Sequence, residues 1–465
     1  MSKHRSLALA LVCLGMLGAA STPATARSPK DTAAKPKPSP DVIRMAGEVS
    51  PRRIERSIRK LASFGTRHTL SSQTDPERGI GAARDWLYEQ FQRSAAASGG
   101  RMSVELQSYL QGPAERIPQL TTITNVVATL HGTQPESANR YYVVSGHYDS
   151  RCSDPLDAAC DAPGANDDAS GVAAVLELAR VMATRDFDAT IVFMAVAGEE
   201  QGLFGSDHYA ELAQQANLNV DGMFTNDIIG SSVGQNGQRD PFTVRLFAEG
   251  TPIDETPEEA ELRDVLSGEN DSQARQLARY VKEVGQNRAT GMRVRIIARR
   301  DRFLRGGDHR PFLERRYPAA RFTEVNEDYR HQHQDVRVED GVQFGDLVRF
   351  VDFRYVARVA RVNLAALAGL SRGPARPRDV ALDASELTDD TTLQWSANAE
   401  PDLAGYEIVW RDTTEPLWTH ARFVGNVTSY TVQDITKDNF HFGVRAVDRA
   451  GNRSQVRFPG AVLEE

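Results

Sequence analysis

Two polar motifs follow apolar segments in the middle of the chain. His147 follows the apolar run 141–146, with Asp149 two residues later, and Glu199 and Glu200 follow the run 190–197 after Gly198. Nearly continuous apolar runs are typical of strands that are buried on both faces of a sheet. Open α/β sheets bind ligands at the carboxyl ends of such strands. Imidazole and carboxylate groups at that edge are zinc ligands, so the pattern indicates a metallohydrolase.

Two further acids are placed in the same way. Asp167 lies in the turn 163–171, before an Ala/Val/Leu-rich helical stretch, and Asp227 lies in the strand-like segment 222–229. Asp168 is explained by the favourable interaction of an acid with a helix N-terminus, which is also the alternative explanation for Asp167. We expect Asp167 and Asp227 to bind metal.

Hydrolysis of an amide needs an activated water and a polarised carbonyl, and two metals about 3.5–4 Å apart supply both. Adjacent carboxylates such as Glu199 and Glu200 repel each other unless a cation lies nearby. The simplest interpretation makes one of them a ligand and the other the general base. His147 is the first candidate imidazole ligand, and Asp149 is placed to orient its ring without binding the metal.

A second imidazole is available from the segment 329–335, which contains His331 and His333. In an extended chain these side chains lie on the same face, about 7 Å apart. We therefore expect only one of them to reach a metal pair.

Four motifs in this order resemble those of a known family. His-Tyr-Asp-Ser (147–150), Gly-Ala-Asn-Asp-Asp-Ala-Ser-Gly (164–171), Gly-Glu-Glu-x-Gly-Leu-x-Gly-Ser (198–206) and Asn-Asp-Ile-Ile-Gly (226–230) are similar to those of the co-catalytic zinc exopeptidases of the bacterial leucyl aminopeptidase type. Glutamate carboxypeptidase II and the glutaminyl cyclases share that fold. The resemblance covers roughly residues 45–370.

The resemblance implies two Zn²⁺ ions per chain and a role for each residue. His147 and Asp227 would bind one zinc, Glu200 and the distal histidine the other, with Asp167 bridging the pair and Glu199 as general base.

The family's distal histidine is followed by an acid four residues later. His331 has Asp335 at that distance, whereas His333 has Arg337, so the resemblance selects His331. Some relatives have a tyrosine just before this histidine, where this chain has Arg330.

The implied activity is that of a zinc aminopeptidase that removes N-terminal residues from peptides with a free N-terminus. Carboxypeptidase or glutaminyl cyclase chemistry on the same scaffold is the nearest alternative. A catalytically inactive receptor or adhesion domain is the alternative from another class, but such a protein should lack the base or a ligand. The loop that contains Asp308 and His309 resembles a loop near the substrate in these enzymes, and we assign it no role.

The order of elements predicts an α/β fold with a doubly wound, largely parallel central sheet in residues 42–370. Helical patterns cover 42–64, 80–94, 171–184, which Ser170 would cap, and 350–370; strand-like segments include 104–109, 125–130, 141–146, 190–197, 222–229 and 321–325. Residues 231–300 form an insertion that matches no part of the family.

The composition changes at 371–377, which reads as a linker, and residues 378–465 contain short alternating strands that predict an all-β sandwich. This part resembles a fibronectin type III domain. We expect a spacing or docking module, with surface or carbohydrate contact as another role.

The first residues have the pattern of a secretory signal peptide. A basic start, an apolar core from Leu7 to Leu17 and Ala24-Thr25-Ala26 predict cleavage after residue 26, and residues 27–41 read as a flexible tether; a buried N-terminal helix is the alternative. The protein would then be secreted or periplasmic, where Cys152 and Cys160 would form a disulfide rather than bind metal. The net charge of −8 argues against nucleic-acid binding, and no later apolar run could span a bilayer.

Overall fold

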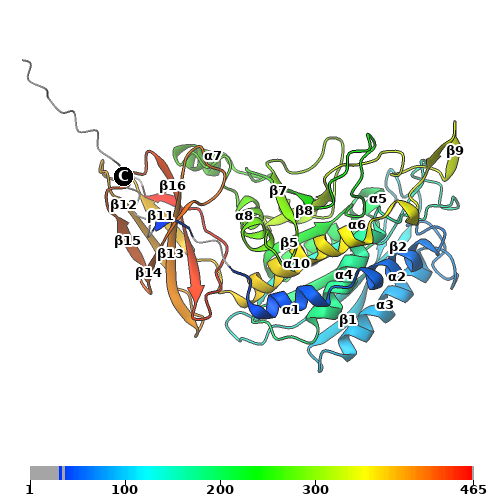
Figure 1. Cartoon of the computed structure of the whole chain (residues 1–465), viewed down its shortest axis with the longest axis horizontal. Coiled ribbons are helices and arrows are strands. Elements are labelled where there is room, and N and C mark those ends of the chain that lie inside the picture. The colour runs from blue at the N-terminus through cyan, green and yellow to red at the C-terminus, as the bar shows by residue number, and fades with distance from the viewer. Residues whose placement is uncertain (1–30, 34–36, 463–465) are drawn as a thin grey trace, which may run out of the picture.

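The computed structural model describes residues 31–33 and 37–462. The predicted signal peptide lies outside the described residues. Figure 1 shows a large α/β part, from α1 (Pro40–Glu48) to α10 (Phe353–Arg372), beside a smaller all-β part. Both parts of the predicted fold class are therefore present.

A mixed eight-stranded sheet forms the centre of the described α/β part. Its middle strands β4, β3, β5 and β8 are parallel, which fits the predicted doubly wound arrangement. On one side, β2 pairs antiparallel with β4, and β1 pairs antiparallel with β2. On the other side, β6 pairs antiparallel with β8. The strands are β1 (Met102–Gln111), β2 (Thr121–Leu130), β3 (Arg140–His147), β4 (Thr190–Val196), β5 (Asn219–Asn226), β6 (Thr243–Phe247), β7 (Arg293–Ile297) and β8 (Ala319–Glu324).

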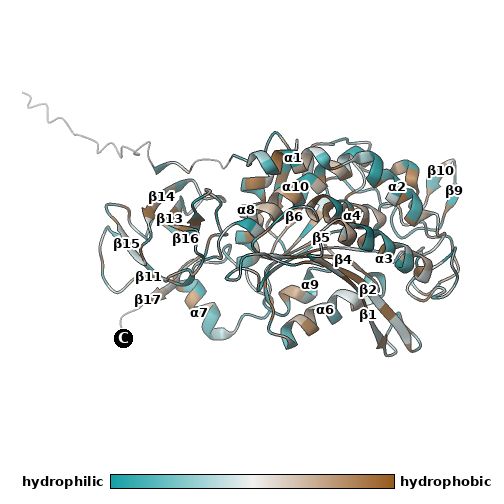
Figure 2. Ribbon diagram, turned by 90° about the horizontal axis from the view of Figure 1, so that it is seen from below, coloured by the Kyte–Doolittle hydropathy of each residue, from teal (hydrophilic) through white to brown (hydrophobic). Residues whose placement is uncertain are grey.

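Helices cover both faces of this sheet (Figure 2). One face carries α1, α2, α3, α4, α8 and α10, and the other carries α6 and α9. Every residue of β4 is buried, as a strand between two helical layers requires. The further helices are α2 (Pro51–Ala62), α3 (Ile80–Ala96), α4 (Ala169–Met182), α5 (Glu199–Gly202), α6 (Phe204–Gln215), α7 (Pro257–Val265), α8 (Gln273–Gly285) and α9 (Arg310–Leu313).

The segment expected to be one helix over 42–64 is two helices. Pro51 lacks an N–H donor and cannot continue α1, but it fits the first turn of α2. Ser50 caps that new helix by accepting a hydrogen bond from the Arg53 N–H. The periodicity was right, and the proline sets the break.

The unmatched segment 231–300 enlarges the sheet. It contributes β6 and β7 at one edge, and α8, which packs against α10. A small hairpin of β9 (Arg337–Glu339) and β10 (Val342–Phe344) and a 3₁₀ turn, η2 (Val348–Phe350), follow β8. No helix of the described residues is long and apolar enough to cross a membrane.

The C-terminal part is a sandwich of a four-stranded and a three-stranded sheet within the described residues. Trp395, Tyr406 and Trp410 lie in the core between the sheets. The strands are β11 (Arg378–Asp383), β12 (Thr391–Ser396), β13 (Leu403–Asp412), β14 (His420–Gly425), β15 (Ser429–Val432), β16 (Phe440–Asp448) and β17 (Gly460–Val462).

The sandwich contacts α8 of the insertion, and Asp271 just before it, through polar groups. The Arg445 guanidinium lies 3.0 Å from the Glu283 carboxylate, and Arg411 lies 2.6 Å from Asp271. Trp418 donates a hydrogen bond to the Gln276 side chain at 3.0 Å. The insertion therefore attaches the sandwich to the α/β part.

Candidate active site

The chain places five of the predicted residues together at one edge of the sheet. His147 ends β3, Asp227 follows β5, and Glu199 and Glu200 begin α5 just after β4. Asp167 lies in the turn before α4. They converge because the carboxyl ends of parallel strands meet at this edge.

Two groups of possible metal ligands lie side by side. His147, Glu199 and Asp227 form one, and Asp167, Glu200 and His333 form the other; within each group the ligand atoms lie within 4.8 Å of one another. The two oxygens of Asp167 point to different groups. Oδ1 lies 3.1 Å from Nε2 of His147, and Oδ2 lies 3.1 Å from Nε2 of His333. This is the arrangement that a bridging carboxylate needs.

The second imidazole of the site is His333, and the assignment of His331 is corrected. Nε2 of His333 lies 3.0 Å from the Glu200 carboxylate. The His331 ring instead stacks on Phe350, with ring centroids 3.6 Å apart, and its Nδ1 lies 3.6 Å from Asp328.

The backbone conformation of this segment explains why His333, and not His331, reaches the site. The segment is not extended: a turn covers 329–330, and His333 has a left-handed φ of 50°. Asp335, the acid that favoured His331, accepts a hydrogen bond from the Ser153 N–H at 3.2 Å and donates its own N–H to Ser153 Oγ at 3.0 Å. Asp335 thus attaches this loop to the segment after β3.

Asp149 supports two candidate ligands at once. Nδ1 of His147 lies 3.2 Å from the main-chain oxygen of Asp149 and 3.5 Å from its Oδ1. Its Oδ2 accepts a hydrogen bond from the Glu200 N–H at 3.0 Å. Asp168, rather than Ser170, caps α4, and it also accepts the His147 N–H at 3.1 Å.

Two positioning residues were not found from the sequence. Arg321 on β8 is fully buried, donates to the main-chain oxygen of Asp227 at 2.8 Å, and lies 2.9 Å from Oδ1 of the same residue. Asp346 accepts hydrogen bonds from the N–H groups of Asn166 and Asp167, the latter at 2.7 Å. Both are far along the chain from the residues they hold, and no local motif signals them.

Buried carboxylates dominate the electrostatics of the site. Burial raises the pKa of Glu199 well above its ordinary range, and the neighbouring Asp227 and Glu200 raise it further, against the opposite effect of His147. Burial alone would lower the pKa of His147, but Glu199, Asp149 and Asp167 raise it well above its usual value. Without a metal ion, Glu199 and His147 therefore hold their protons tightly, and a bound cation would compensate the negative charge in their place.

The donor set fits zinc. Nε2 of His147 and Oε1 of Glu200 are buried and have no hydrogen-bond partner among the described residues. Both atoms belong to the two ligand groups, and imidazole with carboxylate is a ligand set that zinc accepts. Each group thus offers a buried atom without a partner that could bind a metal ion.

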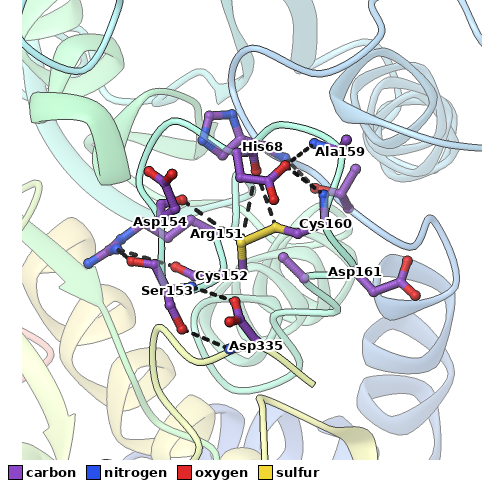
Figure 3. The surroundings of a disulfide bond; sticks show 12 residues. His68, Arg151, Cys152, Ser153, Asp154, Ala159, Cys160, Asp161 and Asp335 are labelled. Atoms are coloured by element: carbon purple, nitrogen blue, oxygen red, sulfur yellow. Dashed lines mark hydrogen bonds between the residues drawn. A yellow bond between two sulfur atoms is a disulfide. The ribbon is translucent and has the colours of Figure 1, made fainter. Parts of the chain in front are cut away.

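A disulfide closes the loop beside the site, as predicted. Cys152 and Cys160 are joined, with 6.5 Å between their Cα atoms, and Figure 3 shows Arg151 next to the bond and Asp335 bound to Ser153. Arg151 donates to the Glu200 carboxylate at 3.0 Å. Nη2 of Arg151 also lies 2.7 Å from Nδ1 of His333, so the loop contacts two members of the second ligand group.

The ligand groups open into a cavity of about 530 Å³. Five carboxylates and four arginines line it. They are Glu115, Asp167, Glu199, Glu200, Asp227, Arg116, Arg151, Arg302 and Arg305. No described residue of the sandwich is among the lining residues.

Known proteins resemble this chain over most of its length. Residues 125–339 match peptidase family M28. A protein of Pyricularia oryzae described as a probable zinc metalloprotease is 54% identical over 428 residues, covering 91% of this chain and 85% of that protein. A probable zinc metalloprotease of Leptosphaeria maculans is 52% identical over 425 residues, covering 91% of this chain and 98% of that protein.

The chain belongs to peptidase family M28. It is accordingly a zinc metallopeptidase.

Among solved structures, LapA of Legionella pneumophila has a TM-score of 0.49 and 21% identity, covering 70% of this metallopeptidase and 76% of LapA. An aminopeptidase of Aneurinibacillus sp. strain AM-1 has a TM-score of 0.49 and 16% identity, covering 70% of this chain and 96% of that protein.

Proposed function

We propose that this metallopeptidase is an exported aminopeptidase with two zinc ions, which removes residues from the free N-terminus of peptides. The observation that carries the proposal is the position of Asp167. Each of its oxygens lies 3.1 Å from an imidazole of a different ligand group. His147 and Asp227 would hold one ion, Glu200 and His333 the other, and Asp167 both.

Two bound zinc ions would polarise the scissile carbonyl and lower the pKa of a water molecule. The remaining chemistry falls to Glu199. Glu199 lies among the first group of possible ligands, with its Oε2 3.9 Å from Nε2 of His147, while its neighbour Glu200 belongs to the second group. In this proposal His147, Asp227 and Asp167 suffice for the first ion, which leaves the Glu199 carboxylate free to act as a base. As general base, Glu199 takes the proton of the attacking water and delivers it to the leaving nitrogen.

A free N-terminus needs a negative partner in the cavity. Glu115 lines the cavity, is exposed, and belongs to neither ligand group. It is the acid best placed to receive the substrate ammonium without competing for metal.

The experiment compares aminoacyl-p-nitroanilides with the same compounds carrying a blocked amine. We expect zinc-dependent release from the free amines and at least 100-fold slower release from the blocked ones. Preferential cleavage of N-blocked peptides at their C-terminus would favour carboxypeptidase action, and cyclisation of N-terminal glutamine would favour glutaminyl cyclase chemistry.

Export is proposed on the signal-like first residues and is supported by the Cys152–Cys160 disulfide, since such bonds persist in oxidising compartments. A mature protein beginning near Arg27, outside the reducing cytosol, is the expected result of N-terminal sequencing. Retention of residues 1–26 in the mature protein would contradict it.

A further inference from the structure

Two arginines of the cavity have no acidic partner. Neither Arg116 nor Arg305 forms an ion pair with a carboxylate of the described residues, whereas Arg151 pairs with Glu200 and Arg302 with Glu327. Both unpaired side chains are only partly exposed. A partly buried guanidinium without a counter-charge is a natural partner for an anion, because it offers several donors in a planar fork.

Both side chains lie beside the same half of the metal site. Arg116 donates to the main-chain oxygen of Glu200 at 3.0 Å, and Nη1 of Arg305 lies 3.1 Å from Nδ1 of His333. Glu200 and His333 are themselves 3.0 Å apart. A group that both arginines reach would therefore lie next to the second ligand group, close to the scissile bond.

Nδ1 of His333 is shared between two arginines, since Nη2 of Arg151 lies 2.7 Å from it, and Nη2 of Arg305 also donates to Gln332 Oε1 at 3.5 Å. A neutral imidazole that gives Nε2 to a metal carries its proton on Nδ1, and Nδ1 then accepts no hydrogen bond. Nη1 of Arg305 is then available to another acceptor, and the 3.5 Å contact of Nη2 with Gln332 is a long hydrogen bond to an uncharged group.

The net charge of the cavity also favours an anion. Four guanidinium groups nearly balance the five lining carboxylates, and two divalent ions would leave a clear positive excess. Such a cavity attracts anions.

We infer that Arg116 and Arg305 bind a carboxylate of the substrate, within one or two residues of the scissile bond. This inference rests on the proposed function. The carboxylate has two possible sources: the side chain of an acidic N-terminal residue, or the C-terminus of a very short peptide.

Matched pairs of compounds distinguish the two sources. Glutamyl- and glutaminyl-p-nitroanilide differ only in the side-chain carboxylate, and Leu-Gly and Leu-Gly-amide only in the C-terminal one. In at least one pair we expect the acid to exceed the amide in kcat/KM by roughly 10- to 100-fold, the usual scale for hydrogen bonds between charged groups.

Arg305→Gln and Arg116→Gln should each bring that ratio close to one. Arg310→Gln is the matched control, because Arg310 is on the neighbouring surface, pairs with Glu314 and does not line the cavity. Its ratio should be unchanged. The zinc content of each variant is measured, so that a lost ion is not mistaken for a lost substrate contact.

Equal kcat/KM for acid and amide in both pairs would overturn the inference, as would ratios that survive both substitutions. If the zinc-loaded protein cleaves none of the four compounds, the aminopeptidase proposal fails on its own. Calorimetric binding of the same four compounds then decides the inference, and equal affinities for acid and amide would refute it.

Discussion

Replacing Arg321 tests how the fold supports the proposed metal site. This fully buried guanidinium donates to the Asp227 main chain, lies 2.9 Å from its carboxylate, and lies 3.0 Å from the Asp301 carboxylate. Arg321→Gln would leave two buried carboxylates without their counter-charge. Removing one partner of a buried ion pair costs about 3–5 kcal/mol, a large part of the roughly 5–15 kcal/mol that stabilises a domain.

The same change should weaken one metal site more than the other. Loss of the group that orients a metal ligand typically lowers metal affinity by roughly 10- to 100-fold. Asp227 belongs to the His147 group, so the first zinc should bind more weakly while the site at Glu200 and His333 keeps its affinity. Arg321→Lys keeps the charge but loses the planar fork, and should recover only part of the effect.

The assays are urea unfolding of the metal-free protein and zinc titration against a competing chelator. Arg245→Gln is the control: Arg245, on the adjacent strand β6, pairs with Glu327 and touches no proposed ligand. It should change stability without changing either zinc affinity. If Arg321→Gln unfolds at the wild-type urea concentration and binds both ions normally, Asp227 does not depend on Arg321 and the reasoning fails.

Three further predictions follow from the same geometry. His333→Ala should lose one zinc and most activity while His331→Ala keeps both ions; the opposite result in metal analysis would restore His331. Glu199→Gln should lower turnover by about 10²–10⁴-fold with both zinc ions retained, whereas Glu200→Gln should lose zinc; near-normal turnover of Glu199→Gln would remove it as the base. Burial raises the pKa of Glu199, and it raises that of Asp308 to about 7, so the folded metal-free protein holds protons that the unfolded chain has lost. Its melting temperature should therefore fall as the pH rises from 5 to 8, and it should fall more steeply than that of the zinc-loaded protein. Parallel melting curves of the two forms against pH would contradict this.

The sequence allowed the strand-end part of the site to be predicted. His147, Asp167, Glu199, Glu200 and Asp227 each stand next to an apolar strand or a helix start, and parallel strands bring those positions to one edge. Their placement therefore follows from local pattern and sheet topology together. Their roles as ligands and base stay predictions.

The second histidine could not be predicted in this way. His333 comes from an irregular loop, where neither the period of a strand nor that of a helix applies, and its left-handed φ turns the ring toward Asp167. The spacing to Asp335 misled because Asp335 binds Ser153 in the disulfide loop. Arg321 and Asp346 were missed for another reason: their contacts are long-range, and neither residue belongs to a motif.

The most direct test of the account is anomalous diffraction at the zinc edge from crystals of the zinc-loaded protein. We predict two peaks on either side of Asp167, one beside His147 and Asp227 and the other beside Glu200 and His333. A single peak, or a peak bound by His331, would contradict the two-zinc site proposed for this metallopeptidase.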